Sequence, residues 1–313
     1  MRAITYDRFG GPEVLRLSER PDPVPGPGQV RVDLEAASVI PADWKLRAGR
    51  LTDLFTVQFP KIPGRDGAGV VSAIGPGVDY ARLGDRVCVI AQHGENGTYA
   101  QSILRDRDSL TPAPVTLAPA EAAALMHAGV CAVICIEEIA RVRPRQRVLI
   151  QGGAGAIGSL AVQLAHHAGA FVAATARAEN AAHLRAMGAD QAIAYDREDF
   201  TRIAAPFDIV LDLIGGEVHQ RSYSVLAPGG HMVCLRAAPF QDRSAEHAVR
   251  LTLAEIHDRP ETLRRVVALA DQRVLRPQVA LRLPLERAAE AHRLMQEGRI
   301  SRGRIVLDIP PRP

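Results

Sequence analysis

The sequence predicts an α/β protein that combines a doubly wound parallel sheet with a second, β-rich part. An apolar strand, a glycine-rich turn and an amphipathic helix follow one another between Arg147 and Gly169. Strands and helices alternate from there to Leu235, whereas the first 118 residues hold short strands between frequent glycine and proline turns. Alternating strands and helices favour a parallel sheet, and closely spaced short strands favour a compact β domain.

The glycine turn has the spacing of a dinucleotide-binding loop. Gly153, Gly155 and Gly158 fit the pattern G-x-G-x-x-G, and Ala156 and Ile157 open the helix that follows. The first glycine allows a tight turn, the second lets the backbone approach a pyrophosphate, and the third lets the helix pack on the strand. The helix N-terminus offers N–H groups and partial positive charge to phosphates. We therefore expect a dinucleotide site, the alternative being a plain glycine turn in an α/β domain.

The N-terminal part is expected to consist mostly of strands. The expected strands cover residues 1–6, 14–17, 31–39, 67–78 and 83–91. Four prolines in PDPVPGPGQ bar regular structure between the second and third strands. PADWKLRAG suggests a short helical turn that Gly49 closes.

The middle of the chain begins with a long apolar helix, expected from Pro119 to Ala140 with a break near Gly129. The strands that follow are expected at 147–151, 171–175, 191–195, 207–213 and 231–235, with helices at 156–168, 178–187 and 218–226. After Leu235 the pattern weakens. A helix over 261–274, an extended segment, a helix over 285–297 and a final strand, GRIVLDI, complete the chain.

The final strand must find a sheet, and a return to the N-terminal part would make that domain discontinuous. We therefore expect a β-rich domain formed by residues 1–118 and 259–313, with a nucleotide-binding domain formed by residues 119–258. The 313 residues of the chain are sufficient for two domains.

Composition excludes several classes of protein. The formal net charge is only +3 and no block of basic residues occurs, so nucleic-acid binding is unsupported. The four cysteines form no C-x-x-C pair, which argues against a disulfide framework or a structural zinc knuckle. The start of the chain lacks the apolar segment of a signal peptide. The apolar run from Ala122 to Ile136 is interrupted by His127 and is expected to be too short to span a bilayer. We expect a soluble, cytoplasmic protein without a membrane partner.

Several segments follow one another in a specific order along the chain: PDPVPGPGQVRVDLEAASVIPADWKLRAG, IPGRDGAGVVSAIGPGV, LGDRVCV, VLIQGGAGAIGSLAVQLA, LRAMGADQAIAYD, DIVLDLIGG, LAPGGHMV and GRIVLDI. This order of motifs resembles the medium-chain dehydrogenase/reductase superfamily, in particular its zinc-independent quinone oxidoreductase branch. The resemblance implies a GroES-like catalytic domain, a Rossmann nucleotide domain and a cleft between them. It also implies a homodimer formed by edge pairing of nucleotide-domain sheets.

The resemblance also identifies departures from the zinc-dependent alcohol dehydrogenases of the same superfamily. Where those enzymes have a Cys, a His-Glu pair and a third ligand, this sequence has Ile40, then Arg65 and Asp66, then His127. Isoleucine cannot ligate a metal and arginine is a permanent cation, so we expect no zinc and no other metal. The quinone reductase branch usually has Asn where this chain has Ile40, which makes the expected substrate pocket more apolar.

The resemblance places the cofactor's adenosine end beside the second strand of the nucleotide unit. An NAD-preferring fold usually has a carboxylate there for the ribose hydroxyl, but this chain has Thr175 and then Arg177. A guanidinium can bind a 2′-phosphate, so we expect NADPH; the alternative for Arg177 is a solvated loop arginine. Tyr195 matches a family tyrosine near the adenosine phosphate, and Arg299 is a weaker candidate.

The candidate catalytic residues also follow from the family positions. His127 is expected to face the nicotinamide, and its unperturbed pKa suits proton donation; the alternative is a core histidine bonded to the backbone. Cys131, one helical turn on, is expected to touch the nicotinamide ring. Asp43 and Lys45 are expected on the opposite lip, with Asp43 more a loop-holding residue than an acid. Trp44 can stack on a flat substrate or belong to the core. The expected substrate pocket contains Ile40, Trp44 and Arg65.

We therefore expect a zinc-independent, NADPH-dependent reductase of quinones or of activated C=C or carbonyl acceptors. An enoyl-thioester reductase would use the same cofactor geometry. A non-catalytic NADPH-binding protein is the third hypothesis, because the family Asn is missing.

Overall fold

The computed structural model describes residues 1–203, 205–235 and 240–312. The chain folds into two compact units. The first comprises Met1–His127, Asp258–Asp271 and Pro277–Pro313, and the second comprises Ala128–His257 and Gln272–Arg276. The first unit thus extends beyond the expected boundary at residue 118, because the start of the long helix packs on it: the Cys88 thiol contacts the carbonyl oxygen of Ala122 at 3.9 Å.

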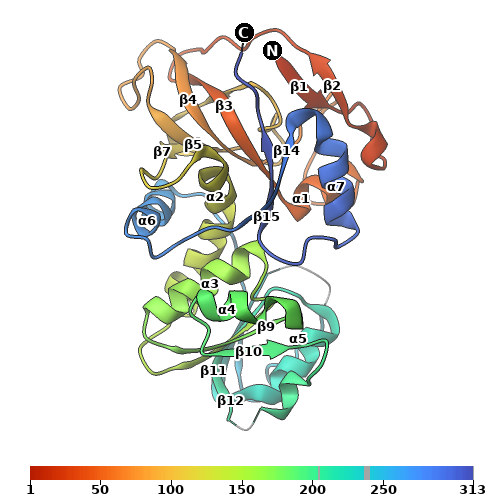
Figure 1. Cartoon of the computed structure of the whole chain (residues 1–313), viewed down its shortest axis with the longest axis vertical. Coiled ribbons are helices and arrows are strands. Elements are labelled where there is room, and N and C mark those ends of the chain that lie inside the picture. The colour runs from red at the N-terminus through yellow and green to blue at the C-terminus, as the bar shows by residue number, and fades with distance from the viewer. Residues whose placement is uncertain (204, 236–239, 313) are drawn as a thin grey trace. The chain divides into compact units, whose positions relative to one another are not determined.

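The first unit is built around a seven-stranded sheet (Figure 1). Its strands are β3 (Val30–Val39), β4 (Asp66–Ile74), β5 (Arg86–Ile90), β6 (Ser102–Arg105), β7 (Leu110–Pro112), β14 (Val279–Pro284) and β15 (Arg304–Asp308). The order is β14-β15-β3-β4-β5-β7, with β6 also paired to β3. Strand β15 pairs antiparallel with β3, so both ends of the chain contribute to one sheet. The strands β1 (Arg2–Thr5) and β2 (Arg16–Glu19) form a separate antiparallel pair.

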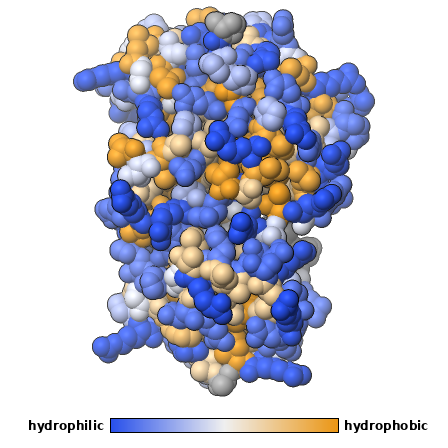
Figure 2. All heavy atoms as spheres, in the orientation of Figure 1, coloured by the Kyte–Doolittle hydropathy of each residue, from blue (hydrophilic) through white to orange (hydrophobic). Residues whose placement is uncertain are grey.

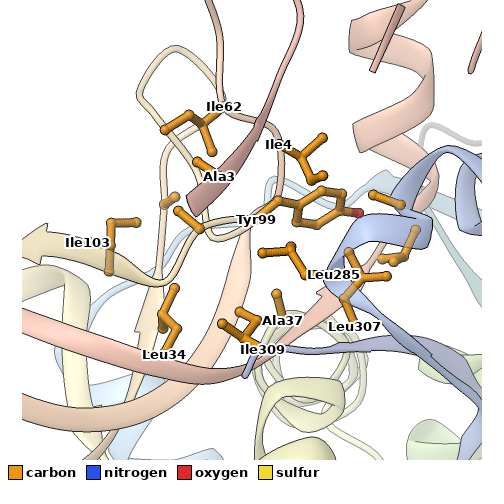
Figure 3. Close-up of a cluster of buried hydrophobic side chains, with 14 of the residues drawn as sticks. Ala3, Ile4, Leu34, Ala37, Ile62, Tyr99, Ile103, Leu285, Leu307 and Ile309 are labelled. Atoms are coloured by element: carbon orange, nitrogen blue, oxygen red, sulfur yellow. The ribbon is translucent and has the colours of Figure 1, made fainter. Parts of the chain in front are cut away.

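Apolar residues from distant parts of the sequence fill the core of this unit. Figure 3 shows the Tyr99 ring among side chains from the N-terminal strand, from β3 and from the C-terminal segment. Alternation of buried and less buried residues along β3, for instance Val30, Val32 and Leu34, gives the sheet its apolar face. The helices α1 (Pro41–Arg47), α6 (Pro260–Asp271) and α7 (Ala288–Gln296) complete the unit.

The second unit is a doubly wound parallel sheet. Its strands are β8 (Arg147–Gln151), β9 (Phe171–Ala176), β10 (Gln191–Ala194), β11 (Phe207–Asp212), β12 (Leu226–Cys234) and β13 (Arg250–Leu253). The order is β10-β9-β8-β11-β12-β13, which is the Rossmann order and confirms the predicted fold class. Its helices include α3 (Ala156–His167), α4 (Ala181–Ala186) and α5 (Gly216–Ser222). Strand β13 was not predicted, because it has only four residues and lies in the part of the sequence after Leu235 where the pattern weakens.

The linking helix differs from the sequence prediction in two respects. Helix α2 (Pro119–Val133) passes Gly129 without a break and continues as a π-helix over Ile134–Ile139. Glycine costs only about 1 kcal/mol in a helix, and burial of its neighbours outweighs that cost. The continuous helix Pro119–Ile139 has the length and composition of a membrane span, so the expectation that its apolar run is too short to cross a bilayer was wrong. However, 78% of its most apolar window is buried inside the protein, as in a core helix. Hydrophilic residues cover most of the face shown in Figure 2.

Candidate functional site

The glycine turn of the second unit is shaped by close backbone contacts. A Cβ added to Gly158 would lie 2.2 Å from the carbonyl oxygen of Gly152, so only glycine lets α3 pack this closely on the turn. A Cβ on Gly153 would lie 2.7 Å from the Cβ of Ala174 on β9. At Gly155 the nearest atom would be 3.4 Å away, which leaves the outer side of the turn open. The turn is thus tight toward the fold and open where a phosphate would approach.

The N-terminus of α3 is available to an anion. Gly155 is its N-cap residue, and in the part of the chain that the structure describes no side-chain cap accepts a hydrogen bond from the first turn. Ala156 and Ile157 occupy that turn and are half-buried. The free N–H groups and the helix dipole favour negative charge at this end. These residues therefore fit the pyrophosphate of a dinucleotide.

Thr175 stabilises the turn itself. Its hydroxyl donates to Oε1 of Gln151 over 2.8 Å and accepts a hydrogen bond from the N–H of Gly152 at 3.0 Å. Its carbonyl oxygen accepts from the N–H of Gly153 at 2.8 Å. The side chain is buried, so Thr175 acts on the loop that would hold a cofactor.

A hollow of about 330 Å³ lies beside the turn within the second unit. Its lining includes Gln151, Gly152, Thr175, Tyr195, Glu198 and Ile214. Tyr195 is 53% exposed, and its hydroxyl accepts a hydrogen bond from Nε of the exposed Arg177 at 3.4 Å. The structure therefore brings Arg177, Tyr195 and the glycine turn into one region.

Two carboxylates that sequence reasoning missed lie in this region. Asp196 accepts a hydrogen bond from the N–H of Ala178 at 2.8 Å, and Glu198 accepts from the N–H of Ala194 at 2.7 Å. Both follow β10, in a segment whose sequence carries no cofactor-binding motif. Of the two other candidates for cofactor binding, Arg299 is an exposed residue of the first unit, and Cys131 is a buried residue of the second.

A charged cluster in the first unit joins Arg65 to His127. Nε of Arg65 donates to Nδ1 of His127 at 3.3 Å, and NH1 donates to the carbonyl oxygen of Ala91 at 3.2 Å. NH2 donates to Oδ2 of Asp258 at 2.5 Å, and the same oxygen accepts from Gln92 at 3.3 Å. The side chains of Arg65 and Asp258 are only 6% and 8% exposed, so this is a buried ion pair.

The surroundings keep the His127 imidazole neutral. Burial and then the positive charge of Arg65 hold the pKa of His127 well below its usual value. Because Nε of Arg65 can only donate, Nδ1 of His127 must accept, and the ring proton therefore resides on Nε2. The expectation of an unperturbed pKa was wrong, because it took no account of burial or of the neighbouring guanidinium.

Asp258 is the residue of this cluster that the sequence did not reveal. It lies 193 positions from Arg65, in a segment without motif or periodicity. Asp258 and Gln92 also form part of the wall of a cavity of about 630 Å³ within the first unit. The cluster is therefore adjacent to open space.

Helix α1 carries the other candidates. Oδ2 of Asp43 accepts hydrogen bonds from the N–H of Ile40 at 2.8 Å and from the hydroxyl of Tyr99 at 3.1 Å, as a loop-holding residue does. Burial raises the pKa of Asp43 to about 7. Trp44 is half-buried with the guanidinium of Arg50 5.3 Å from its ring, and Lys45 is also half-buried. Ile40 is 1% exposed.

The positions that correspond to zinc ligands do not form a metal-binding group. Asp66 is buried and accepts a hydrogen bond from the Ser38 hydroxyl at 2.9 Å, and burial raises its pKa to about 6. Across residues 1–203, 205–235 and 240–312 there is no group of three or more His, Cys, Asp or Glu that could hold a metal ion. The residue beside His127 is instead Arg65, whose guanidinium is a cation and repels metal ions.

Two family models match the chain. The alcohol dehydrogenase GroES-like domain matches residues 26–136, and the zinc-binding dehydrogenase model matches residues 187–307. A 2-haloacrylate reductase from a Burkholderia species is 31% identical over 98% of this chain and 98% of its own length. A quinone oxidoreductase structure from Coxiella burnetii has a TM-score of 0.89 at 33% identity and covers 99% of both chains. The chain belongs to the medium-chain dehydrogenase/reductase superfamily of oxidoreductases, in its quinone oxidoreductase branch.

Other members of the superfamily extend this likeness. The Escherichia coli quinone oxidoreductase solved in complex with NADPH has a TM-score of 0.88 at 25% identity, covering 98% of this chain and 100% of that one. The pikromycin polyketide synthase component PikAII of Streptomyces venezuelae is 33% identical over 93% of this chain. This chain spans only 8% of the length of that relative.

Proposed function

We propose that the protein is a zinc-independent, NADPH-dependent reductase that delivers hydride to a quinone or to a C=C or carbonyl group activated by conjugation. The observation that carries the proposal is the turn between β8 and α3. Gly158 brings the helix onto the turn, and the uncapped helix N-terminus offers N–H groups to a pyrophosphate. Membership of an oxidoreductase superfamily supports the reaction class.

NADPH is preferred over NADH because Arg177 and Tyr195 follow neighbouring strands beside the same hollow. An exposed guanidinium can form two hydrogen bonds to a 2′-phosphate. The two nearby carboxylates, Asp196 and Glu198, already accept backbone hydrogen bonds. The E. coli relative solved with NADPH supports the same choice.

The residues of the first unit are proposed to act on the acceptor. When bound, NADPH supplies the hydride, and the proton that completes the two-electron reduction comes from solvent. His127 is neutral, and its Nε2–H is proposed to stabilise negative charge that develops on an acceptor oxygen. Trp44 and Lys45 are proposed to contact the acceptor, whereas Asp43 holds the start of α1. In this proposal the first unit is the catalytic domain and the second the nucleotide-binding domain, in a cytoplasmic homodimer.

A conjugated C=C bond is a second candidate for the acceptor. The relative from Burkholderia is named for 2-haloacrylate, an α,β-unsaturated carboxylate, and this observation favours such substrates. The match to polyketide synthases makes an α,β-unsaturated thioester a further acceptor worth testing. Quinones and these acceptors share a C=C bond conjugated to a carbonyl group, so one geometry can serve all three.

The test is NADPH oxidation by the purified protein, followed by absorbance, with small quinones, 2-chloroacrylate and a short enoyl-CoA as acceptors. We expect turnover with at least one acceptor, and a loss of about 100-fold in kcat for His127→Ala. His167→Ala is the control, because His167 is an exposed residue in the last turn of α3. Binding of NADPH without turnover on any acceptor would favour the non-catalytic hypothesis.

A further inference from the structure

We propose that Asp258 is a positioning residue that acts through Arg65 to hold His127 as the neutral tautomer protonated on Nε2. The inference rests on the proposed function for its catalytic consequence, but the tautomer itself can be observed without any acceptor. The Asp258–Arg65 pair would thus take the orienting role that a metal ion has in zinc-dependent relatives, using hydrogen bonds in place of coordination.

The contacts of Arg65 fix its guanidinium on three sides. NH1 donates to the carbonyl oxygen of Ala91, NH2 to Asp258, and Nε to His127. A planar guanidinium held at two nitrogens has little freedom at the third, so the direction of Nε–H is set by the other two contacts. The orientation of the donor that meets His127 therefore depends on Asp258.

The ion pair depends on a single carboxylate oxygen. Oδ2 of Asp258 accepts from both Arg65 and Gln92, whereas Oδ1 is buried without a hydrogen-bond partner. No direct bond joins the other nearby carboxylate, Asp66, to Arg65 in the described part of the chain, although its charge acts on the same region. Loss of the Asp258 charge would therefore leave the buried guanidinium without its directly bonded counter-ion.

The charges around His127 favour the same protonation state. Arg65, Arg304 and His93 each lower the pKa of His127, in addition to burial. These charges keep the His127 imidazole neutral but do not determine whether its proton resides on Nδ1 or on Nε2. The hydrogen bond from Nε of Arg65 makes that choice, because it occupies the lone pair of Nδ1. The tautomer of His127 therefore distinguishes a positioning role of Asp258 from a purely electrostatic effect on the pKa of His127.

The experiment is ¹⁵N–¹H correlation spectroscopy of histidine side chains in the full-length protein, with His127→Gln used to assign the His127 signals. In the wild type we expect one neutral tautomer, protonated on Nε2, from pH 5 to pH 8. Asp258→Asn is expected to give a mixture of tautomers and a fall of at least tenfold in kcat, while the KM for NADPH stays within twofold. Asp258→Glu, which keeps the charge, is expected to restore the tautomer in part.

Asp79→Asn is the matched control, because it removes a carboxylate from an exposed ion pair with Arg107 in the same unit. It should change neither the His127 signals nor the rate. The inference is overturned if wild-type His127 is protonated on Nδ1, or if Asp258→Asn keeps both the wild-type tautomer and the wild-type rate. A wild-type protein that shows the expected tautomer but reduces no acceptor would instead contradict the proposed function.

Discussion

The hydroxyl of Tyr99 donates a hydrogen bond to Oδ2 of Asp43 at 3.1 Å, and both side chains are buried. The same hydroxyl lies 3.3 Å from Nε2 of His292 on α7. Since the Tyr99 proton points to Asp43, Nε2 of His292 must be the donor in the second contact. Tyr99 therefore connects the start of α1 to α7 through a polar chain within the apolar core of the first unit.

Removal of the Tyr99 hydroxyl should destabilise this unit. Tyr99→Phe leaves a buried carboxyl group and a buried imidazole each without one partner, which is expected to cost about 1–3 kcal/mol. Tyr6→Phe is the control, because Tyr6 is equally buried but its hydroxyl makes no hydrogen bond in the described part of the chain. Urea unfolding of both variants would measure the difference. Equal midpoints for the two variants would contradict the assigned network.

Stability should fall as the pH rises through the titration of Asp43. Burial raises its pKa from 3.8 to about 7, so the folded protein holds this proton more tightly than the unfolded chain does. The contribution to the free energy of unfolding is present at low pH and is lost between about pH 4 and pH 7. Asp66, whose pKa is raised to about 6, acts in the same direction.

The variant Asp43→Asn should reduce this dependence, because an amide keeps the oxygen acceptor and does not ionise. We expect its loss of stability between pH 5 and pH 8 to be smaller than that of the wild type by the order of 1 kcal/mol or more. Asp7→Asn is the control, since Asp7 is exposed. Urea midpoints at both pH values provide the measurement, and parallel slopes for wild type and Asp43→Asn would refute this assignment.

Local constraints explain which parts of the site were predictable. Gly153, Gly155 and Gly158 lie within six consecutive residues, so their spacing alone indicates their roles. Asp258 bonds to Arg65 across 193 positions, and Tyr99 bonds to Asp43 across 56. Such pairs are set by strand pairing and core packing and leave no local pattern. The pKa of His127 likewise depends on burial and on Arg65, neither of which its own segment reveals.

Two glycine variants should separate packing from cofactor binding. Gly158→Ala places a Cβ 2.2 Å from the carbonyl oxygen of Gly152, so we expect a loss of stability of about 1–3 kcal/mol. Gly155→Ala meets its nearest atom at 3.4 Å and should leave the unfolding midpoint nearly unchanged. Its added methyl group should instead weaken NADPH binding about tenfold or more, measured by fluorescence titration. Full NADPH affinity in Gly155→Ala would argue against a pyrophosphate at this turn.

The edge strand β13 should mediate self-association. It ends the parallel sheet of the second unit, and Leu253 on it is 36% exposed. An open edge offers backbone groups for pairing with a second copy around a twofold axis. We expect sedimentation equilibrium to show a dimer for the wild type and a monomer for Leu253→Asp. Ala192→Asp on the opposite edge strand, β10, should remain dimeric. A monomeric wild type, or dissociation by the control alone, would contradict this interface.

Arg177 should determine the preference for NADPH over NADH. Its guanidinium is exposed beyond β9 and donates to the Tyr195 hydroxyl at 3.4 Å, so it can turn to a phosphate without breaking a buried contact. Loss of a charge-assisted bond to phosphate is worth about 1.5–3 kcal/mol. Arg177→Ala should therefore raise the KM for NADPH by about 10- to 100-fold and leave that for NADH within threefold. The exposed Arg185 on α4 supplies the control variant, Arg185→Ala, which should behave as wild type. An equal change in both KM values would show that Arg177 does not read the 2′-phosphate, and the carboxylates of Asp196 and Glu198 would then become the residues to test for contact with a ribose hydroxyl.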